Sequence, residues 1–199
     1  MRGAIHDSSP IHADQSPKIM TGLFRLTTAA LAASACMSLT AAYAQPKPSP
    51  TEQATLLGQF GDWGAYKASP GGKVVCFALS KPTKAVTEPA GRPRDASYAF
   101  VSTRPAEKVR NEVSVIVGYP QKPGLDATAT VGSANYVMYT QNDGAWVKNA
   151  AEEAQMIDAM RKGADLVVKS ESARGTKTSD TYSLKGLGEA LEKVAQECK

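Results

Sequence analysis

Histidine is almost absent from this sequence. Only two of its 199 residues are histidine, and both lie near the start, at positions 6 and 12. Most of the chain therefore has no imidazole to act as a general base, to complete a Ser-His-Asp or Cys-His arrangement, or to bind a metal ion. Enzymes that depend on these groups are excluded once the first residues are removed.

Motifs for other kinds of catalysis are absent as well. The sequence has no G-x-S-x-G, no P-loop and no G-x-G-x-x-G, and no S-x-x-K follows residue 44. We predict no cofactor. One enzyme class needs none of these motifs, because a glycosidase works with two carboxylates. Four aspartates scattered along the chain could supply such a pair: Asp62, Asp126, Asp143 and Asp180.

Charged residues are missing from a run near the start, Leu26–Ala44, which follows Lys18 and Arg25 and ends in Ala-Tyr-Ala. This pattern predicts a secretory signal peptide over residues 20–44, cleaved between Ala44 and Gln45. Residues 1–19 are then an extension or a mis-assigned start. The alternative is a retained membrane anchor, but the run is rich in Ala, Thr and Ser and poor in Leu. We therefore predict no membrane span in the mature protein.

Cleavage would leave a Pro-rich leader over residues 45–57 and one domain over residues 58–199. From Gln45 onward the chain has 20 basic and 17 acidic residues, a balance that argues against nucleic-acid binding. Cysteine is scarce: Cys36 would be lost with the signal peptide, which leaves Cys76 and Cys198. Two cysteines in an exported chain indicate one disulfide, and an oxidising compartment disfavours the alternative of two free buried thiols.

Short segments with alternating or β-branched residues dominate the remaining chain and predict about eight strands. A two-residue turn at Gly132-Ser133 predicts a type II′ hairpin. Lys73–Ser80 is apolar on both faces and should be a central strand, whereas Lys81–Arg94 contains three prolines and should be a loop. Strands that follow one another in hairpins predict a largely antiparallel sandwich or barrel.

Two helices are expected, over about residues 150–162 and 186–198. Asn149 and Glu152 form a capping-box pattern at the start of the first helix, and Gly163 ends it. The spacing of Ala154, Ile157, Met160 and Arg161 predicts one apolar stripe edged by charge. In the second helix, one face carries Leu187, Leu191, Val194 and Cys198. This places Cys198 on the packed side, where it can pair with Cys76.

The stretch Arg174–Gly186, RGTKTSDTYSLKG, is the one that suggests chemistry. It is either a catalytic loop or a strand, and its period of two favours a strand over Thr176–Ser183. Thr178, Asp180 and Tyr182 would then share the half-buried side. A buried Asp180 needs a cation or amide donors, and Arg104 and Arg174 are both candidates.

Basic residues gather in the region from 92 to 110, where only Asp95 and Glu107 oppose them. This pattern is typical of a solvated loop. The alternative is an anion-binding loop for lipopolysaccharide or a host glycan, formed by Arg92, Arg94, Arg104, Lys108 and Arg110.

Long ordered blocks resemble the invasion-associated locus B family of exported bacterial proteins. They are FGDWGAY, VCFALSKP, STRPAEKVRNEVSVIVGYP, the segment DGAWVKNAAEEAQMIDAMRKGADLVVKSESARGTKTSDTYSLKGLGEAL, and the closing EC. The resemblance implies a periplasmic or surface-associated protein with an immunoglobulin-like β-sandwich. The family is named for a role in host-cell invasion and offers no catalytic residues to carry over.

The sequence therefore predicts an exported, non-catalytic envelope protein that binds a partner in the envelope or on a host surface. Two alternatives remain open: a carboxylate-based hydrolase of envelope glycans, and an envelope assembly factor that uses an exposed strand edge.

Overall fold

The computed structural model describes residues 53–199. The expected signal peptide, its cleavage site and most of the leader lie outside these residues. The described chain forms eleven strands, two α-helices and two short 3-10 turns: β1 (Thr55–Phe60), β2 (Trp63–Ala68), η1 (Pro70–Gly72), β3 (Val75–Ser80), β4 (Lys84–Glu88), β5 (Tyr98–Arg104), η2 (Pro105–Glu107), β6 (Val109–Ile116), β7 (Ala127–Val131), β8 (Ala134–Gln141), β9 (Gly144–Val147), α1 (Ala150–Lys162), β10 (Asp165–Glu171), β11 (Lys177–Ser183) and α2 (Leu187–Glu197). Between residues 53 and 199, neither helix is long and apolar enough to cross a membrane.

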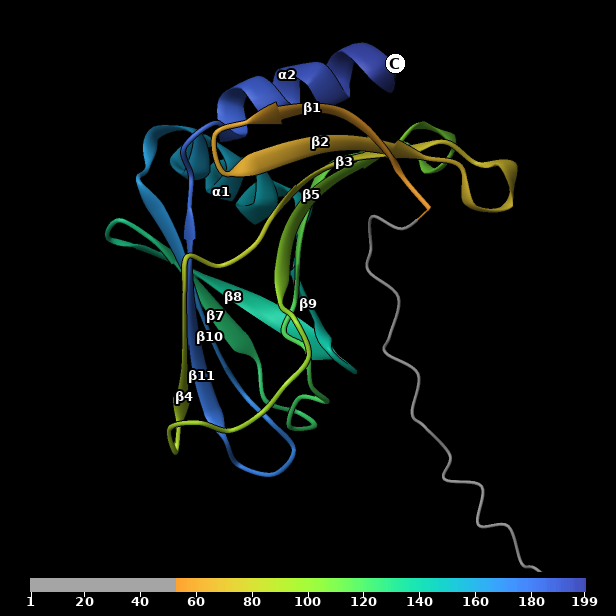
Figure 1. Ribbon diagram of the computed structural model, residues 1–199. Helices are drawn as coiled ribbons and strands as arrows, with labels where there is room; N and C mark the ends of the chain where they lie inside the picture. Colours follow the sequence, from red (N-terminus) through yellow and green to blue (C-terminus); the bar gives the residue numbers. More distant parts are fainter. Residues whose placement is uncertain (1–52) are drawn as a thin grey trace, which may run out of the picture. The chain divides into compact units, whose positions relative to one another are not determined.

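All eleven strands belong to one antiparallel sheet, in the order β1-β2-β3-β5-β6-β9-β8-β7-β10-β11-β4. The sheet bends strongly but is not closed, and β1 and β4 are its two edges (Figure 1). The predicted antiparallel, mainly β architecture is confirmed. The structure shows a single sheet where the sequence suggested a sandwich of two, because β6 pairs with β9 and β7 with β10, which join the successive hairpins into one ladder.

Strand β4 corrects the prediction that Lys81–Arg94 is a loop. The chain leaves β3, pairs through β4 with β11 at the far edge, and returns so that β5 lies beside β3. The prolines at positions 82, 89 and 93 flank this strand and do not interrupt it. A short strand bounded by prolines is typical of a sheet edge, because proline cannot donate to a ladder.

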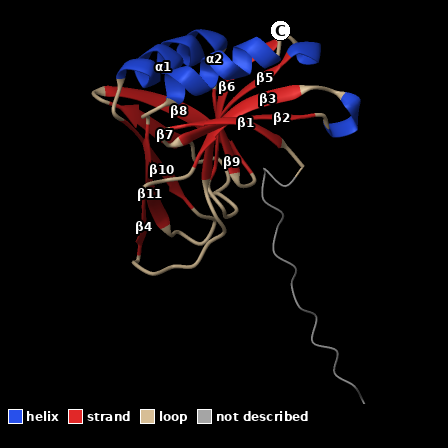
Figure 2. Ribbon diagram, turned by 45° about the horizontal axis from the view of Figure 1, so that its top comes forward, coloured by secondary structure: helices blue, strands red, loops and turns tan. Residues whose placement is uncertain are grey.

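Both helices lie across one end of the curved sheet (Figure 2), α2 against β1–β3 and α1 mainly against β6. Asn149 caps α1 as predicted, and its side chain accepts a hydrogen bond from the Glu152 amide at 2.9 Å. The predicted stripe of α1 was partly wrong: Ala154 is exposed, and Met156 is buried beside Ile157 and Met160. The predicted face of α2 and the cysteine that follows it, Leu187, Leu191, Val194 and Cys198, are all buried.

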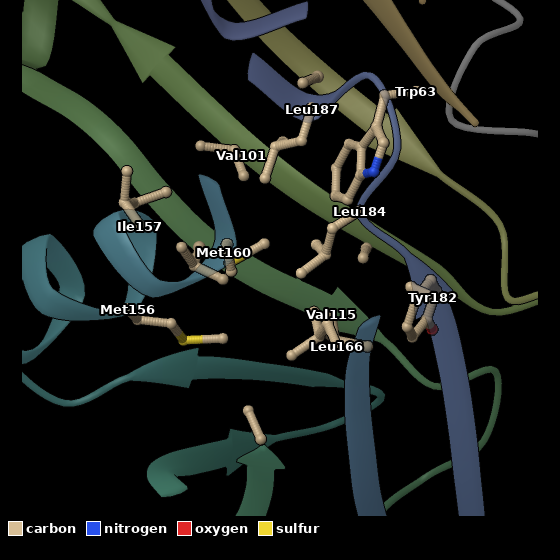
Figure 3. Packing of buried hydrophobic residues seen from close by; sticks show 14 of the residues in the cluster. Trp63, Val101, Val115, Met156, Ile157, Met160, Leu166, Tyr182, Leu184 and Leu187 are labelled. Carbon is tan, nitrogen blue, oxygen red and sulfur yellow. The ribbon is translucent and has the colours of Figure 1, made fainter. Parts of the chain in front are cut away.

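The main core lies between the inner face of the sheet and the two helices. Methionines of α1, valines of β5 and β6, and leucines that flank or belong to α2 meet there around Trp63 and Tyr182 (Figure 3). Transfer of apolar surface from water contributes about 25 cal/mol per Å² and dominates the stability of such a core.

The end of β11 meets the turn between β1 and β2. The Trp63 Nε1–H donates to the Ser183 carbonyl at 2.8 Å, and the Asp62 amide donates to the Lys185 carbonyl at 3.0 Å. Gly186, which precedes α2, has φ +88°, and a Cβ there would overlap the Phe60 carbonyl oxygen. Only glycine fits this crossing without movement of the backbone.

The predicted disulfide is present. Cys76 of β3 and Cys198, which follows α2, are bonded, with their Cα atoms 5.9 Å apart. Both residues are buried, so the bond attaches the end of α2 to the inner face of a strand flanked on both sides.

Candidate binding site

Strand β11 has the alternation that the sequence predicted. Thr178, Asp180 and Tyr182 are buried on its inner side, while Lys177 is exposed on its outer side. The polar stretch from residue 174 to 186 is therefore a hairpin turn, a strand and the approach to a helix, and its buried side faces a polar centre.

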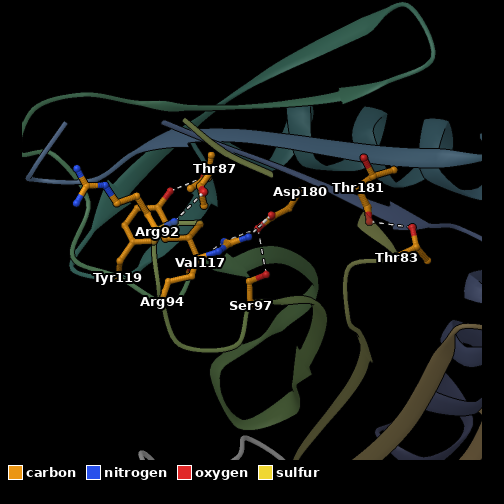
Figure 4. Close-up of polar contacts among 10 residues, drawn as sticks. Thr83, Thr87, Arg92, Arg94, Ser97, Val117, Tyr119, Asp180 and Thr181 are labelled. Atoms are coloured by element: carbon orange, nitrogen blue, oxygen red, sulfur yellow. Dashed lines mark hydrogen bonds and ion pairs between the residues drawn. The ribbon is translucent and has the colours of Figure 1, made fainter. Parts of the chain in front are cut away.

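Asp180 forms this centre with Arg94, which lies in the connection between β4 and β5. Arg94 Nη1 donates to Asp180 Oδ2 at 2.7 Å, and Nη2 donates to Oδ1 (Figure 4). Only 1% of the Asp180 side chain and 11% of the Arg94 side chain are exposed. A bidentate arginine–carboxylate pair fixes both side chains, and the hydrogen bond to Asp180 raises the pKa of the Arg94 guanidinium.

Further contacts hold the pair in place. Ser97 Oγ donates to Asp180 Oδ2 at 3.0 Å, and Arg94 Nη1 also donates to the Val117 carbonyl at 3.0 Å. The guanidinium of Arg94 lies 6.0 Å from the centre of the Tyr119 ring, within cation–π range. Two segments, the β4–β5 connection and the residues that follow β6, are thereby joined to β11.

The partner predicted for Asp180 was wrong. Arg104 forms ion pairs with Glu112 and Glu107 instead, at 2.8 and 2.7 Å, and these hydrogen bonds, led by Glu112, raise its pKa. Arg174 is exposed in the turn between β10 and β11. Arg94 reaches Asp180 because the connection after β4 crosses the inner side of the β4–β11 pair, an arrangement that depends on the unforeseen strand β4.

A cavity of about 340 Å³ opens beside the Arg94–Asp180 pair. Arginine, hydroxyl-bearing residues and one proline line it, and no acidic residue does. The lining comes from β4 and the connection that follows it, the segment after β6 and the β10–β11 hairpin: Thr87, Arg92, Pro93, Arg94, Tyr119, Ser172, Arg174, Thr176 and Thr178. We call it the arginine cavity.

The predicted anion-binding loop does not form one group. Arg92 and Arg94 precede β5, whereas Arg104, Lys108 and Arg110 follow it or end it. A seven-residue strand separates the two sets by about 20 Å, since a strand advances about 3.3 Å per residue. The arginine cavity instead combines Arg92 and Arg94 with Arg174.

The hydroxyl groups of this cavity were not predicted. One signal was available, because Thr176 lies just before β11 and Thr178 shares the inner side of that strand with Asp180. Tyr119 and Ser172 gave no such signal, because their positions depend on pairings between distant segments.

The four aspartates considered for a hydrolase lie on different elements. Asp180 is bound by Arg94, Asp126 forms an ion pair with Lys148 at 2.6 Å, and Asp62 and Asp143 lie in separate hairpin turns. Asp126 does line another cavity, of about 370 Å³, together with Glu88 and Glu171. There the hydrogen bond from Lys122 lowers the pKa of Glu171, the opposite of the raised pKa that a general acid needs.

Within residues 53–199, no cluster of three or more His, Cys, Asp or Glu residues could hold a metal ion. The family model described as "Invasion associated locus B (IalB) protein" matches residues 67–195. No curated protein and no solved structure matches the chain significantly.

Proposed function

The chain belongs to the invasion associated locus B (IalB) family, and from this premise we propose that it is an exported, non-catalytic protein of the cell envelope that acts by binding. The observation that carries the proposal is the buried Cys76–Cys198 disulfide, since such bonds form and persist in oxidising compartments outside the cytoplasm. The uncharged run and the Ala-Tyr-Ala motif that precede the described residues support the same location.

Binding is favoured over catalysis because the most buried carboxylate has a structural role. Asp180 is fully engaged by Arg94 and Ser97, and Asp126 is engaged by Lys148. The arginine cavity, in contrast, has exposed charged groups at its rim. The name of the family points to association with host cells as one setting for this binding.

The two edges of the sheet argue against the alternative role as an envelope assembly factor. β4 has five residues, includes Lys84 and Glu88, and is followed by Pro89. β1 has six residues and a shift of register between Leu56 and Gly58. Short edges with charges, proline or bulges discourage the addition of another strand.

Fractionation of bacteria that express the full-length chain tests the proposal. Thiols are blocked before lysis, and the intact mass of the periplasmic protein is measured. We expect a periplasmic species that begins at Gln45 and has no free thiol, whereas a control chain without residues 20–44 should stay in the cytoplasm with reduced cysteines. A membrane-anchored species that retains residues 20–44, or a cytoplasmic one with free thiols, contradicts the proposal.

The binding role is tested by cross-linking and pull-down from intact envelopes. The oxidised protein is the bait, and protein that has been reduced and heat-denatured is the control. A specific envelope component captured only by the folded bait supports the role. Turnover of an envelope glycan by the purified protein, with no captured component, contradicts it.

A further inference from the structure

We propose that the arginine cavity is a binding site for a phosphate monoester, carried either by a soluble sugar phosphate or by a lipid headgroup. The structural feature behind this proposal is one cavity lined by two arginines without ion pairs among residues 53–199, Arg92 and Arg174, and by three buried hydroxyl-bearing residues, Tyr119, Ser172 and Thr178.

The lining of the cavity carries an excess of positive charge. Arg94 is already neutralised by Asp180, so it contributes a fixed wall to the cavity and no net charge. Arg92 and Arg174 form no ion pair with any residue between 53 and 199, and both are exposed. Figure 4 shows the Arg92 side chain extending away from Asp180, toward the outside of the polar centre. The cavity therefore presents about two unpaired positive charges and no acidic group.

Hydroxyl groups of the cavity can donate hydrogen bonds to a ligand. Ser172 Oγ accepts a hydrogen bond from the Thr176 amide at 3.0 Å, and Thr87 Oγ1 accepts one from the Arg92 amide at 3.2 Å. A hydroxyl that accepts in this way keeps its own hydrogen available for a ligand. Ser172 is only 6% exposed, so its hydroxyl is held in position by the hairpin that also carries Arg174.

The arginines and hydroxyl groups of the cavity match the chemistry of a phosphate monoester. A phosphate monoester carries about −1.5 to −2 charge at pH 7 and three acceptor oxygens, and arginine binds it through two parallel N–H bonds. A carboxylate has one charge and two oxygens, and it would leave one guanidinium without a partner. The charge and the number of donors in the cavity therefore fit phosphate better than carboxylate.

The size of the cavity limits the rest of the ligand. The cavity volume of about 340 Å³ lies at the lower end of the range of small-molecule sites, about 300–1,000 Å³. Pro93 and the ring of Tyr119 supply an apolar wall beside the arginines. The site thus has room for a phosphate and the single ring or short chain that carries it.

The Arg94–Asp180 pair acts as a positioning element for this site. Arg92 lies two residues before Arg94, so the ion pair that fixes Arg94 also fixes the segment that carries Arg92. Arg174 comes from a different segment, more than 80 residues later. A ligand that contacts both arginines would connect the two segments and stabilise the folded state against heat.

Calorimetric titration of the purified, oxidised full chain tests the proposal. The probes are glucose 6-phosphate, glucose 6-sulfate and glucuronate, which differ in their anionic group. Vesicles of phosphatidylcholine with and without phosphatidic acid present the phosphate monoester on a lipid. We expect saturable binding of the phosphate at the cavity, at least tenfold tighter than of the other two anions, with a rise in Tm. Binding only to phosphatidic acid vesicles identifies a lipid headgroup as the source of the phosphate, and binding only to the soluble ester identifies a free sugar phosphate.

Matched variants locate the site. Arg92→Gln and Arg174→Gln should each weaken phosphate binding about 10- to 100-fold, since a charge-assisted hydrogen bond contributes roughly that factor. Arg110→Gln removes the same charge from an exposed position beyond the far end of β5 and should change the affinity less than twofold. Far-ultraviolet circular dichroism confirms that each variant is folded. Equal losses in all three variants, undiminished affinity in the double variant Arg92→Gln/Arg174→Gln, or no preference for phosphate in either form overturns the proposal. None of these results depends on where the protein is located in the cell.

Discussion

The guanidinium of Arg94 and the carboxylate of Asp180 are removed from water together. Their hydrogen bonds compensate for the cost of burial only while both partners are present, because a single buried charge is much less stable than a pair. The pair therefore specifies where the β4–β5 connection lies on β11, whatever its net contribution to stability.

A double-mutant cycle measures this coupling. Asp180→Asn and Arg94→Gln should each lower the free energy of unfolding by about 3–5 kcal/mol, because each leaves a buried charge unpaired. The double variant replaces the ion pair by two amides and should be more stable than the sum of the two losses implies. Urea denaturation followed by the fluorescence of Trp63 and Trp146 gives the three values. Simple additivity would show that the pair is not coupled.

Tyr182 contributes a pH dependence at high pH. Its hydroxyl is buried without a hydrogen-bond partner between residues 53 and 199, and burial raises the pKa of the phenol above its ordinary value. Because the folded state holds this proton more tightly than the unfolded state, the contribution to stability is complete below about pH 10 and is lost as the pH rises further.

Tyr182→Phe removes the unpaired hydroxyl together with this dependence. We expect the variant to be as stable as the wild type or slightly more stable at pH 7, and to lose stability less steeply between about pH 9.5 and 11, around the ordinary pKa of tyrosine. Urea denaturation over this pH range provides the comparison. Parallel curves for the two proteins would mean that the phenol ionises equally in the folded and unfolded states.

At this scale, the sequence could predict which residues are buried but not which residues they meet. The alternation from Thr176 to Ser183 was sufficient to place Asp180 inside. Its partner Arg94 lies 86 residues earlier, and no local pattern links the two positions. Ser97 and Val117 also reach Asp180 or Arg94 only through the curvature of the sheet.

Helix α2 begins where the chain at Gly186 crosses the end of β1 so closely that no side chain fits between them. Gly186 has φ +88° and lies directly against the Phe60 carbonyl, whereas a Cβ added at Gly188, inside the helix, would meet no atom within 4 Å. These two glycines are two residues apart, and their substitution by alanine should change the stability of the protein in opposite directions.

Gly186→Ala should destabilise the protein by at least about 1–2 kcal/mol, the cost of the left-handed conformation alone, with more from the clash. Gly188→Ala should stabilise it by about 0.5–1 kcal/mol, since alanine favours a helix interior. Thermal unfolding of the two variants side by side gives the answer. A Gly186→Ala protein with unchanged Tm would mean that the backbone at the crossing moves freely.

Most elements were predictable because their signals are local. The cap at Asn149, the turn at Gly132-Ser133 and the apolar face of α2 were all found from spacing, and the register Val131↔Ala134 confirms the two-residue turn. Strand β4 was missed because the prolines that flank it were taken as a sign that the whole segment is a loop. The sequence could not predict whether the strands form one sheet or two, since that depends on which hairpins pair with one another.

At the scale of the whole molecule, one covalent bond spans most of the described chain. The Cys76–Cys198 disulfide joins residues 122 positions apart, so it strongly restricts the unfolded state. The chain-entropy model gives about 4–5 kcal/mol for a loop of this length, and removal of native disulfides usually costs about 2–5 kcal/mol.

The variant Cys76→Ala/Cys198→Ala tests this contribution. It should keep the same circular dichroism spectrum at low temperature but lose about 2–5 kcal/mol of unfolding free energy in urea. Because α2 also packs through Leu187, Leu191 and Val194, we expect it to remain in place. An unchanged midpoint would mean that the unfolded chain is already compact without the bond.

The crossover of β4 has a consequence for the order in which the chain can fold as it emerges from a ribosome or a translocation pore. Strands β1, β2, β3, β5 and β6 can pair soon after they appear, since each lies beside one of the others. β4 cannot pair until β11 has been made. In the same way, the Trp63 indole cannot donate its hydrogen bond before Ser183 is present, and Cys76 cannot form its disulfide before Cys198 is present. All three partners lie between residues 177 and 198. A nascent chain that stops short of this segment therefore holds an unpaired strand, a buried indole without its acceptor and a free thiol, and the last two dozen residues complete all three closures together.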